Sequence, residues 1–272
     1  MPSEANNPAT ADFDAVARIR WARPADPYIR LRLHSGAVDE VLIDDADLRD
    51  HDDLSQPTDI CVAWTAQRPN GERWAVACGS DGAALVRLLE ELHRLRPLDG
   101  VTVPAECFAL LPEHLTSPRP GYWSLWELPQ SAHQNPGNAL ILDEADPRIR
   151  PLLNHSSSAH VFPGDRQATW AGVEHGGELV AVGAEVREPN GLAHLVSICT
   201  HPDFRGRGLA TATIGRLVQH ARAQACTAVA LEMYADNEAG RRAYRRAGFV
   251  EVGQYRSGLL DADRIARLER PR

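Results

Sequence analysis

The sequence predicts an α/β protein of two domains, the second of which alternates strands with helices. Three observations support this prediction. The chain has 272 residues, which is long for one compact domain. Hydrophobic residues make up 43% of it, enough to bury a large core. Near the middle, residues 129–137 are rich in Pro, Asn, Gln and Gly and lack periodicity, so we expect a linker there.

The N-terminal half is expected to hold a tail and an α+β domain. Residues 1–12 lack an apolar core and predict a disordered polar tail rather than a signal peptide. Residues 13–128 predict an α+β domain of unknown role. We expect strands at residues 28–33, 60–66, 73–78 and 121–128, and a helix capped by Ser80 that runs to about Arg94. The Asn70-Gly71 pair predicts a hairpin turn between the second and third of these strands.

Residues 138–272 are expected to form the second domain. The predicted order is strand, helix, three antiparallel strands, helix, strand, helix, strand. Strands are expected at residues 139–142, 168–174, 178–186, 192–200, 227–233 and 249–255, and helices at 146–158, 206–224 and 236–247. The Gly176-Gly177 and Asn190-Gly191 pairs predict the turns that join the three central strands.

Charge and cysteine usage limit the classes of function. The net charge of −8 argues against nucleic acid as a partner, because phosphate binding needs a basic surface. No apolar run reaches the roughly 18 residues that would predict a membrane span. The five cysteines are scattered, and no His, Cys, Asp or Glu cluster has metal-ligand spacing. We therefore expect buried reduced thiols, a cytoplasmic protein, and neither a bound metal nor a membrane partner.

The most specific motif is Arg205-Gly206-Arg207-Gly208, between a predicted strand and a long helix. A helix N-terminus offers backbone N–H groups and a partial positive charge, so an anion can bind where glycines leave the approach open. Arginines add donors for phosphate oxygens. The spacing fits neither a Walker motif nor a dinucleotide fingerprint. A simple glycine-rich turn is the alternative interpretation of these residues alone.

Two motifs resemble the GNAT N-acetyltransferase family. Arg205, Gly208 and Ala210 match its Gln/Arg-x-x-Gly-x-Gly/Ala signature. The segment from Asn237 onward, with Tyr244 before Gly248-Phe249, is similar to the family's Asn-x-x-Ala/Gly turn and Tyr-x-x-x-Gly-Phe ending. The resemblance covers about residues 138–255. It implies a GNAT fold, a mixed and mostly antiparallel sheet flanked by helices.

The resemblance also implies a function and a set of site residues. The implied enzyme transfers the acetyl group of acetyl-CoA directly to an amine, without a metal. The residues that would bind acetyl-CoA are Ile198, Cys199, Thr200, Arg205, Gly206, Arg207, Gly208, Leu209, Ala210 and Asn237. Of these, Ile198 to Thr200 would contact the pantetheine arm and the turn would hold the pyrophosphate. Tyr244 would be catalytic, protonating the leaving thiolate.

Several alternatives stay open at this point. The proton acceptor could be Glu185, His194 or Glu232, while Ser197 is interpreted as packing. The acceptor is a small-molecule or peptide amine of unknown identity, the acyl group could be longer than acetyl, and a homodimer is one expected assembly. The N-terminal domain is either a degenerate GNAT copy or an unrelated α+β domain. Two other functions remain, a non-catalytic regulatory protein that binds acyl-CoA and a protein-interaction scaffold.

Overall fold

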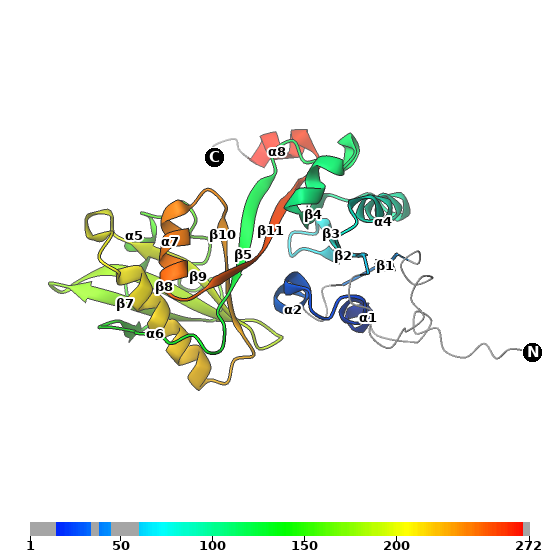
Figure 1. Ribbon diagram of the computed structural model, residues 1–272. Helices are drawn as coiled ribbons and strands as arrows, with labels where there is room; N and C mark the ends of the chain where they lie inside the picture. The colour runs from blue at the N-terminus through cyan, green and yellow to red at the C-terminus, as the bar shows by residue number, and fades with distance from the viewer. Residues whose placement is uncertain (1–14, 34–37, 45–59, 269–272) are drawn as a thin grey trace, which may run out of the picture. The chain divides into compact units, whose positions relative to one another are not determined.

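The computed structural model describes residues 15–33, 38–44 and 60–268, whose helices and strands are drawn in Figure 1. These residues form two compact units. The first comprises the described residues up to Trp123 together with those from Gly253 onward, and the second comprises Ser124–Val252. The expected tail, residues 1–12, lies outside the described ranges. The fold is α/β, with mixed and mostly antiparallel strand pairing and flanking helices, as the sequence predicts.

The first unit is built on the strand order β1-β2-β3-β4-β11. Its elements are α1 (Ala15–Ala22), α2 (Pro27–Arg32), β1 (Val41–Ile43), β2 (Val62–Gln67), β3 (Arg73–Cys78), α4 (Gly82–Leu95), β4 (Gly100–Pro104), two short 3₁₀ helices (Ala105–Leu110 and Glu113–Leu115), β11 (Val250–Leu259) and α8 (Ala262–Leu268). β3 and β4 are parallel, and the other neighbours are antiparallel.

The strand predicted at residues 28–33 is wrong, because this segment is the helix α2. Asp26 is its N-cap, and the carboxylate accepts hydrogen bonds from the N–H groups of Tyr28 at 2.9 Å and Ile29 at 3.3 Å. Pro27 occupies the first turn, where its missing N–H costs nothing. Over six residues, a cap and a proline decide the structure more strongly than the alternation of apolar side chains.

The hairpin around Asn70-Gly71 is confirmed, with Gly71 at a φ of 83°. The following helix α4 begins one residue later than predicted, because its N-cap is Asp81 and not Ser80. The Asp81 carboxylate accepts hydrogen bonds from the second and third N–H groups of the helix, at 2.9 and 3.2 Å. These donors are therefore occupied by a side chain of the protein itself.

The second unit is built on the strand order β5-β10-β9-β8-β7-β6. Its elements are β5 (Gly121–Glu127, which begins in the first unit), β6 (Leu140–Leu142), α5 (Ile149–Leu153), β7 (Ala168–His175), β8 (Glu178–Arg187), β9 (Ala193–Thr200), a 3₁₀ helix (Pro202–Phe204), α6 (Leu209–Ala223), β10 (Val229–Tyr234) and α7 (Glu238–Arg246). β6 to β9 are antiparallel neighbours, whereas β9 and β10 are parallel. The predicted order of strands and helices is confirmed from β6 to β11, and α8, which follows, was not predicted.

Two buried clusters cover the faces of this second sheet. The apolar stripe of α6, including Ile214, Leu217 and Val218, packs with side chains of α7, β9 and β10. On the other face, α5 packs against Val196 and Cys199 of β9 and against the strands beside it. β9 is therefore covered on one face by α6 and on the other by α5.

The segment expected to be a linker, residues 129–137, lies within the second unit. The guanidinium of Arg222 on α6 donates to the carbonyls of Ala132 at 2.8 Å and Pro129 at 3.1 Å. Gln134 donates to the carbonyl of Ala247 at 2.9 Å. The polar composition that suggested a linker instead supplies hydrogen bonds that hold an irregular segment on the ends of α6 and α7.

The two units share one connectivity. In the first, β2 and β3 are antiparallel and α4 crosses over to the parallel strand β4. In the second, β8 and β9 are antiparallel and α6 crosses over to the parallel strand β10. Each parallel ladder contains three residue pairs. A hairpin, a crossover helix and a parallel strand thus occur in this order in both units.

Candidate active site

β9 carries an irregularity in its C-terminal half. Its register with β8 shifts between Val182 and Ala184, and Ser197, opposite this shift, has a φ of 52°. A Cβ at Gly183 would lie 2.3 Å from the Cδ1 of Ile198, so the glycine leaves room for the end of this side chain. A bulge of this kind changes the direction of the strand's peptide groups. The peptide groups of residues 198–200 therefore follow a local bend in the strand.

β9 and β10 separate just before this bulge. Their parallel ladder joins Ala193–Leu195 to Val229–Leu231, and within the described chain no further pair joins the two strands. The edge of β9 that faces β10 is therefore not used by a neighbouring strand from Val196 onward. An extended ligand with amide groups can bind such an edge in the manner of an added strand.

The turn after β9 presents open backbone donors. Gly206 and Gly208 both have a φ of 77°, and a Cβ at either position would meet no atom within 4 Å. Gly208 is the N-cap of α6 and has no side chain to accept from the helix. Within the described ranges, the N–H groups of residues 206–210 have no backbone or side-chain acceptor. The helix dipole adds partial positive charge at the same place.

The two arginines of the turn are exposed and are held by backbone carbonyls. Arg205 donates from Nε to the carbonyl of Thr200 at 3.3 Å. Arg207 donates to the carbonyl of Asp203 at 3.1 Å, and its guanidinium lies 4.9 Å from the centre of the Phe204 ring. A guanidinium has five N–H donors, so both side chains keep donors for an anion.

Cys199 is buried beside this turn and donates its thiol to the carbonyl of Leu152 at 3.2 Å. Burial raises the pKa of this thiol, so it stays protonated near neutral pH. A protonated thiol is a poor nucleophile.

Tyr244 lies on the face of α7 that packs into the core, with ring centres 6.4 Å from Trp126 and 6.2 Å from Phe249. Burial raises the pKa of its phenol to about 12. The group is therefore a neutral O–H near neutral pH and can act only as a proton donor, not as a base.

Asn237 is the N-cap of α7. Its side-chain oxygen accepts from the N–H of Gly240 at 2.9 Å. A Cβ at Gly240 would lie 2.7 Å from the Asn237 side-chain nitrogen. Gly240 thus makes room for the capping side chain, a role that the sequence did not reveal. The cap uses only the oxygen of the Asn237 side chain.

The three candidate proton acceptors lie in different surroundings. Glu185 is buried, 3.0 Å from Arg187 and 3.6 Å from His220. His194 is buried with its Nδ1 3.5 Å from the Glu188 carboxylate, and this histidine is the main cause that lowers the pKa of Glu188 to about 2. Glu232 is half-buried and is the first residue of β10 beyond the last pair with β9. Of the three, Glu232 is the one at the opening between the strands.

The sequence and the fold were compared with those of known proteins. Residues 122–249 match the model of the acetyltransferase (GNAT) family. The fold is similar to that of a GCN5-related N-acetyltransferase from Kribbella flavida, with 14% identity and a TM-score of 0.51 over 72% of this chain and 85% of that one. A comparison with curated proteins returned no match.

Two further solved structures align with lower scores. A GCN5-related N-acetyltransferase from Sphaerobacter thermophilus has 17% identity and a TM-score of 0.48, covering 75% of this chain and 79% of that one. An acetyltransferase from the GNAT family from Colwellia psychrerythraea has 13% identity and a TM-score of 0.48, covering 81% and 99%.

The family and the fold support acyl transfer as the general chemistry. In the described part of the chain, no group of three or more His, Cys, Asp and Glu side chains could hold a metal ion. No helix in the ranges described is long and apolar enough to cross a membrane.

Proposed function

We propose that the protein is an N-acetyltransferase that uses acetyl-CoA and transfers its acetyl group directly to an amine. One observation carries the proposal. A row of backbone N–H donors at the start of α6 directly follows a strand whose C-terminal half has separated from its neighbour. A turn for an anion next to an edge for an extended amide chain matches the two chemical parts of CoA, its pyrophosphate and its pantetheine arm.

In this proposal, the turn before α6 binds the pyrophosphate of acetyl-CoA, and β9 orients the pantetheine arm. The N–H groups of residues 206–210, with Arg205 and Arg207, hold the pyrophosphate. The backbone of Ile198, Cys199 and Thr200 holds the pantetheine arm along β9. Acetyl-CoA supplies the activated acetyl thioester. The protein contributes mainly by placing the amine and the thioester together in a site shielded from water.

Two side chains have proposed roles in proton transfer. An amine attacks only after it loses a proton, and Glu232 at the opening between β9 and β10 is the proposed acceptor, directly or through water. The phenol of Tyr244 has a pKa of about 12, so it is protonated at neutral pH, and it is the proposed donor to the leaving thiolate. Asn237 is proposed to contact the cofactor through the side-chain nitrogen that its cap leaves unused. The net charge of −8 favours a cationic acceptor by electrostatic steering.

The first test is thermal unfolding with acetyl-CoA, with CoA, and with ATP as a control. A ligand that binds only the folded state adds about 2.7 kcal/mol of stability at a hundredfold excess over its Kd. We expect the midpoint to rise with acetyl-CoA and CoA and to stay unchanged with ATP. No shift at millimolar acetyl-CoA would contradict the proposal and favour the scaffold function. A shift without turnover in an amine screen would favour the regulatory function.

We also expect one CoA per chain. In the first unit, the N–H groups at the start of α4 are occupied by the Asp81 carboxylate, which repels phosphate as well. A Cβ at Gly82 would lie 2.3 Å from Leu110, so this helix start is also packed rather than open. Isothermal titration calorimetry with CoA should give a stoichiometry of one. A value of two would show that the first unit binds the ligand despite this cap.

A further inference from the structure

Several contacts fasten the end of β9 and the following turn to residues 152–161, the segment that includes the end of α5. They are Ser197 with Val161, Cys199 with the Leu152 carbonyl at 3.2 Å, the His201 ring with the His155 ring at 4.7 Å, and Arg205 with the His155 carbonyl at 3.5 Å. The segment thus follows β9 on the face opposite α6, beside the residues that would hold the cofactor.

The Ser197 contact differs from the others because one side chain satisfies two backbone groups. Its hydroxyl donates to the carbonyl of Val161 at 2.9 Å and accepts from the N–H of Val161 at 3.2 Å. Ser197 is only 6% exposed. In the described chain, Ser197 and Ala225 are the two residues other than glycine with a positive φ. Such a backbone is unfavourable for a serine and persists only where surrounding contacts hold it.

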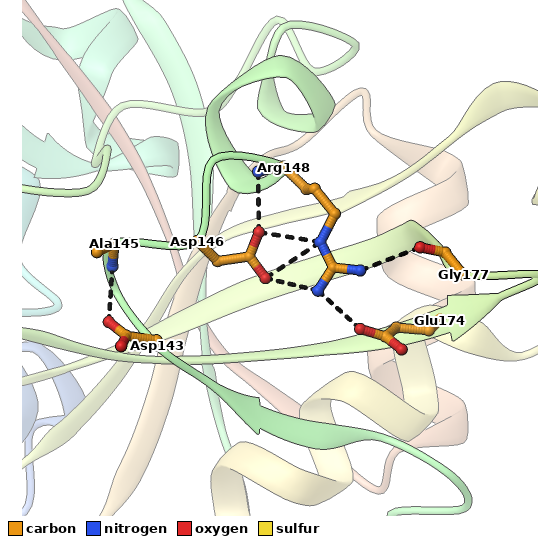
Figure 2. Close-up of polar contacts among 6 residues, drawn as sticks. All are labelled: Asp143, Ala145, Asp146, Arg148, Glu174 and Gly177. Atoms are coloured by element: carbon orange, nitrogen blue, oxygen red, sulfur yellow. Dashed lines mark hydrogen bonds and ion pairs between the residues drawn. The ribbon is translucent and has the colours of Figure 1, made fainter.

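The chain that leads into this segment is fixed independently by Arg148, just before α5 (Figure 2). Its guanidinium contacts Asp146 at 2.7 Å and Glu174 at 2.7 Å, and donates to the carbonyl of Gly177 at 3.1 Å. The hydrogen bond with Arg148 lowers the pKa of Asp146, so the pair is charged at neutral pH. Arg148 thus attaches the start of α5 to the β7–β8 hairpin, while Ser197 attaches Val161, at the other end of the segment, to β9.

We propose that Ser197 is a positioning residue whose hydroxyl holds the bulge of β9 and joins it to Val161, so that the cofactor strand and residues 152–161 are ordered together before any ligand binds. The consequence of this inference rests on the proposed function. It is that the peptide groups of Ile198 and Thr200 are placed correctly for the pantetheine arm. Without the hydroxyl, the bulge and the segment are expected to move independently.

Two variants separate the hydroxyl from the backbone conformation. Ser197→Ala removes both hydrogen bonds and keeps the cost of a positive φ. Ser197→Gly also removes the hydrogen bonds but makes a positive φ easy. Ser117→Ala is the matched control, since Ser117 is a buried serine of the first unit that accepts a backbone N–H from Arg119 at 3.3 Å.

Hydrogen–deuterium exchange of the ligand-free protein and calorimetry with CoA give two readouts, taken well below the unfolding midpoint. In both Ser197 variants we expect exchange at residues 158–163 to speed up at least tenfold and CoA to bind about tenfold more weakly. A loss of fold stability alone would not change the affinity of the folded protein. The control should change neither readout.

Wild-type affinity for CoA in Ser197→Gly would overturn the proposal, because backbone conformation alone would then suffice. Unchanged exchange at residues 158–163 in both variants would overturn it as well. If the wild-type protein binds no CoA, the proposed function fails, while the exchange experiment still tests whether Ser197 orders the segment.

Discussion

Gly208→Trp is expected to abolish CoA binding, with a loss of at least a hundredfold in affinity, or about 2.7 kcal/mol. Gly208 caps α6 with a φ of 77°, and the space around its Cβ position is open within 4 Å. An indole there would fill the space in front of the N–H groups of residues 206–210 that is proposed for the pyrophosphate. Calorimetry with CoA measures the effect directly.

A tryptophan at a positive φ also strains the backbone, so the variant needs a matched control. Gly71→Trp is suitable, because Gly71 has a φ of 83° and no atom within 4 Å of its Cβ position. It lies in the β2–β3 turn of the first unit. We expect a similar loss of stability in both variants and normal CoA affinity in Gly71→Trp alone. Wild-type affinity in Gly208→Trp would remove the turn from the cofactor site.

Tyr244→Phe is expected to lower turnover about a hundredfold, the lower end of the range for a positioned general acid. Phenylalanine keeps the ring that packs against Trp126 and Phe249, so CoA affinity should remain nearly unchanged. The measurement is single-turnover transfer from acetyl-CoA to an amine acceptor identified by screening, together with the Kd for CoA. An equal rate would reduce Tyr244 to a packing residue.

The control for this variant is Tyr255→Phe in the first unit. Tyr255 is also buried, and burial raises the pKa of its phenol too. Loss of a buried phenol at a position without a proposed catalytic role should leave turnover unchanged. If both variants slow the reaction equally, the effect of Tyr244→Phe comes from a general change in packing and not from proton donation.

Local signals in the sequence predicted most of the second unit. The Gly176-Gly177 pair marks the β7–β8 turn, and both glycines have a positive φ in the structure. Gly206 and Gly208 likewise adopt the left-handed conformation that only glycine takes easily. These features depend on a few neighbouring residues, which is why they could be read without the fold.

Short or weakly patterned elements were misread or missed. α1 and β1 were not predicted, since eight and three residues give too few repeats for periodicity to show. β11 was expected to end at Tyr255 but continues to Leu259, because residues 255–259 pair with β4. About 150 residues of chain separate these two strands, and such pairing leaves no local mark in the sequence.

The sequence by itself determined that a glycine- and arginine-containing turn joins a strand to a helix, and that Tyr244 lies on a helix that precedes Gly248-Phe249. Only the tertiary structure decided that β9 parts from β10 after Leu195 and that Glu232 follows this point. It alone showed that Ser197 takes a positive φ and binds Val161. The physical reason is that strand separation, burial and side-chain contacts arise from packing between segments far apart in the chain, whereas turns and caps are decided by adjacent residues.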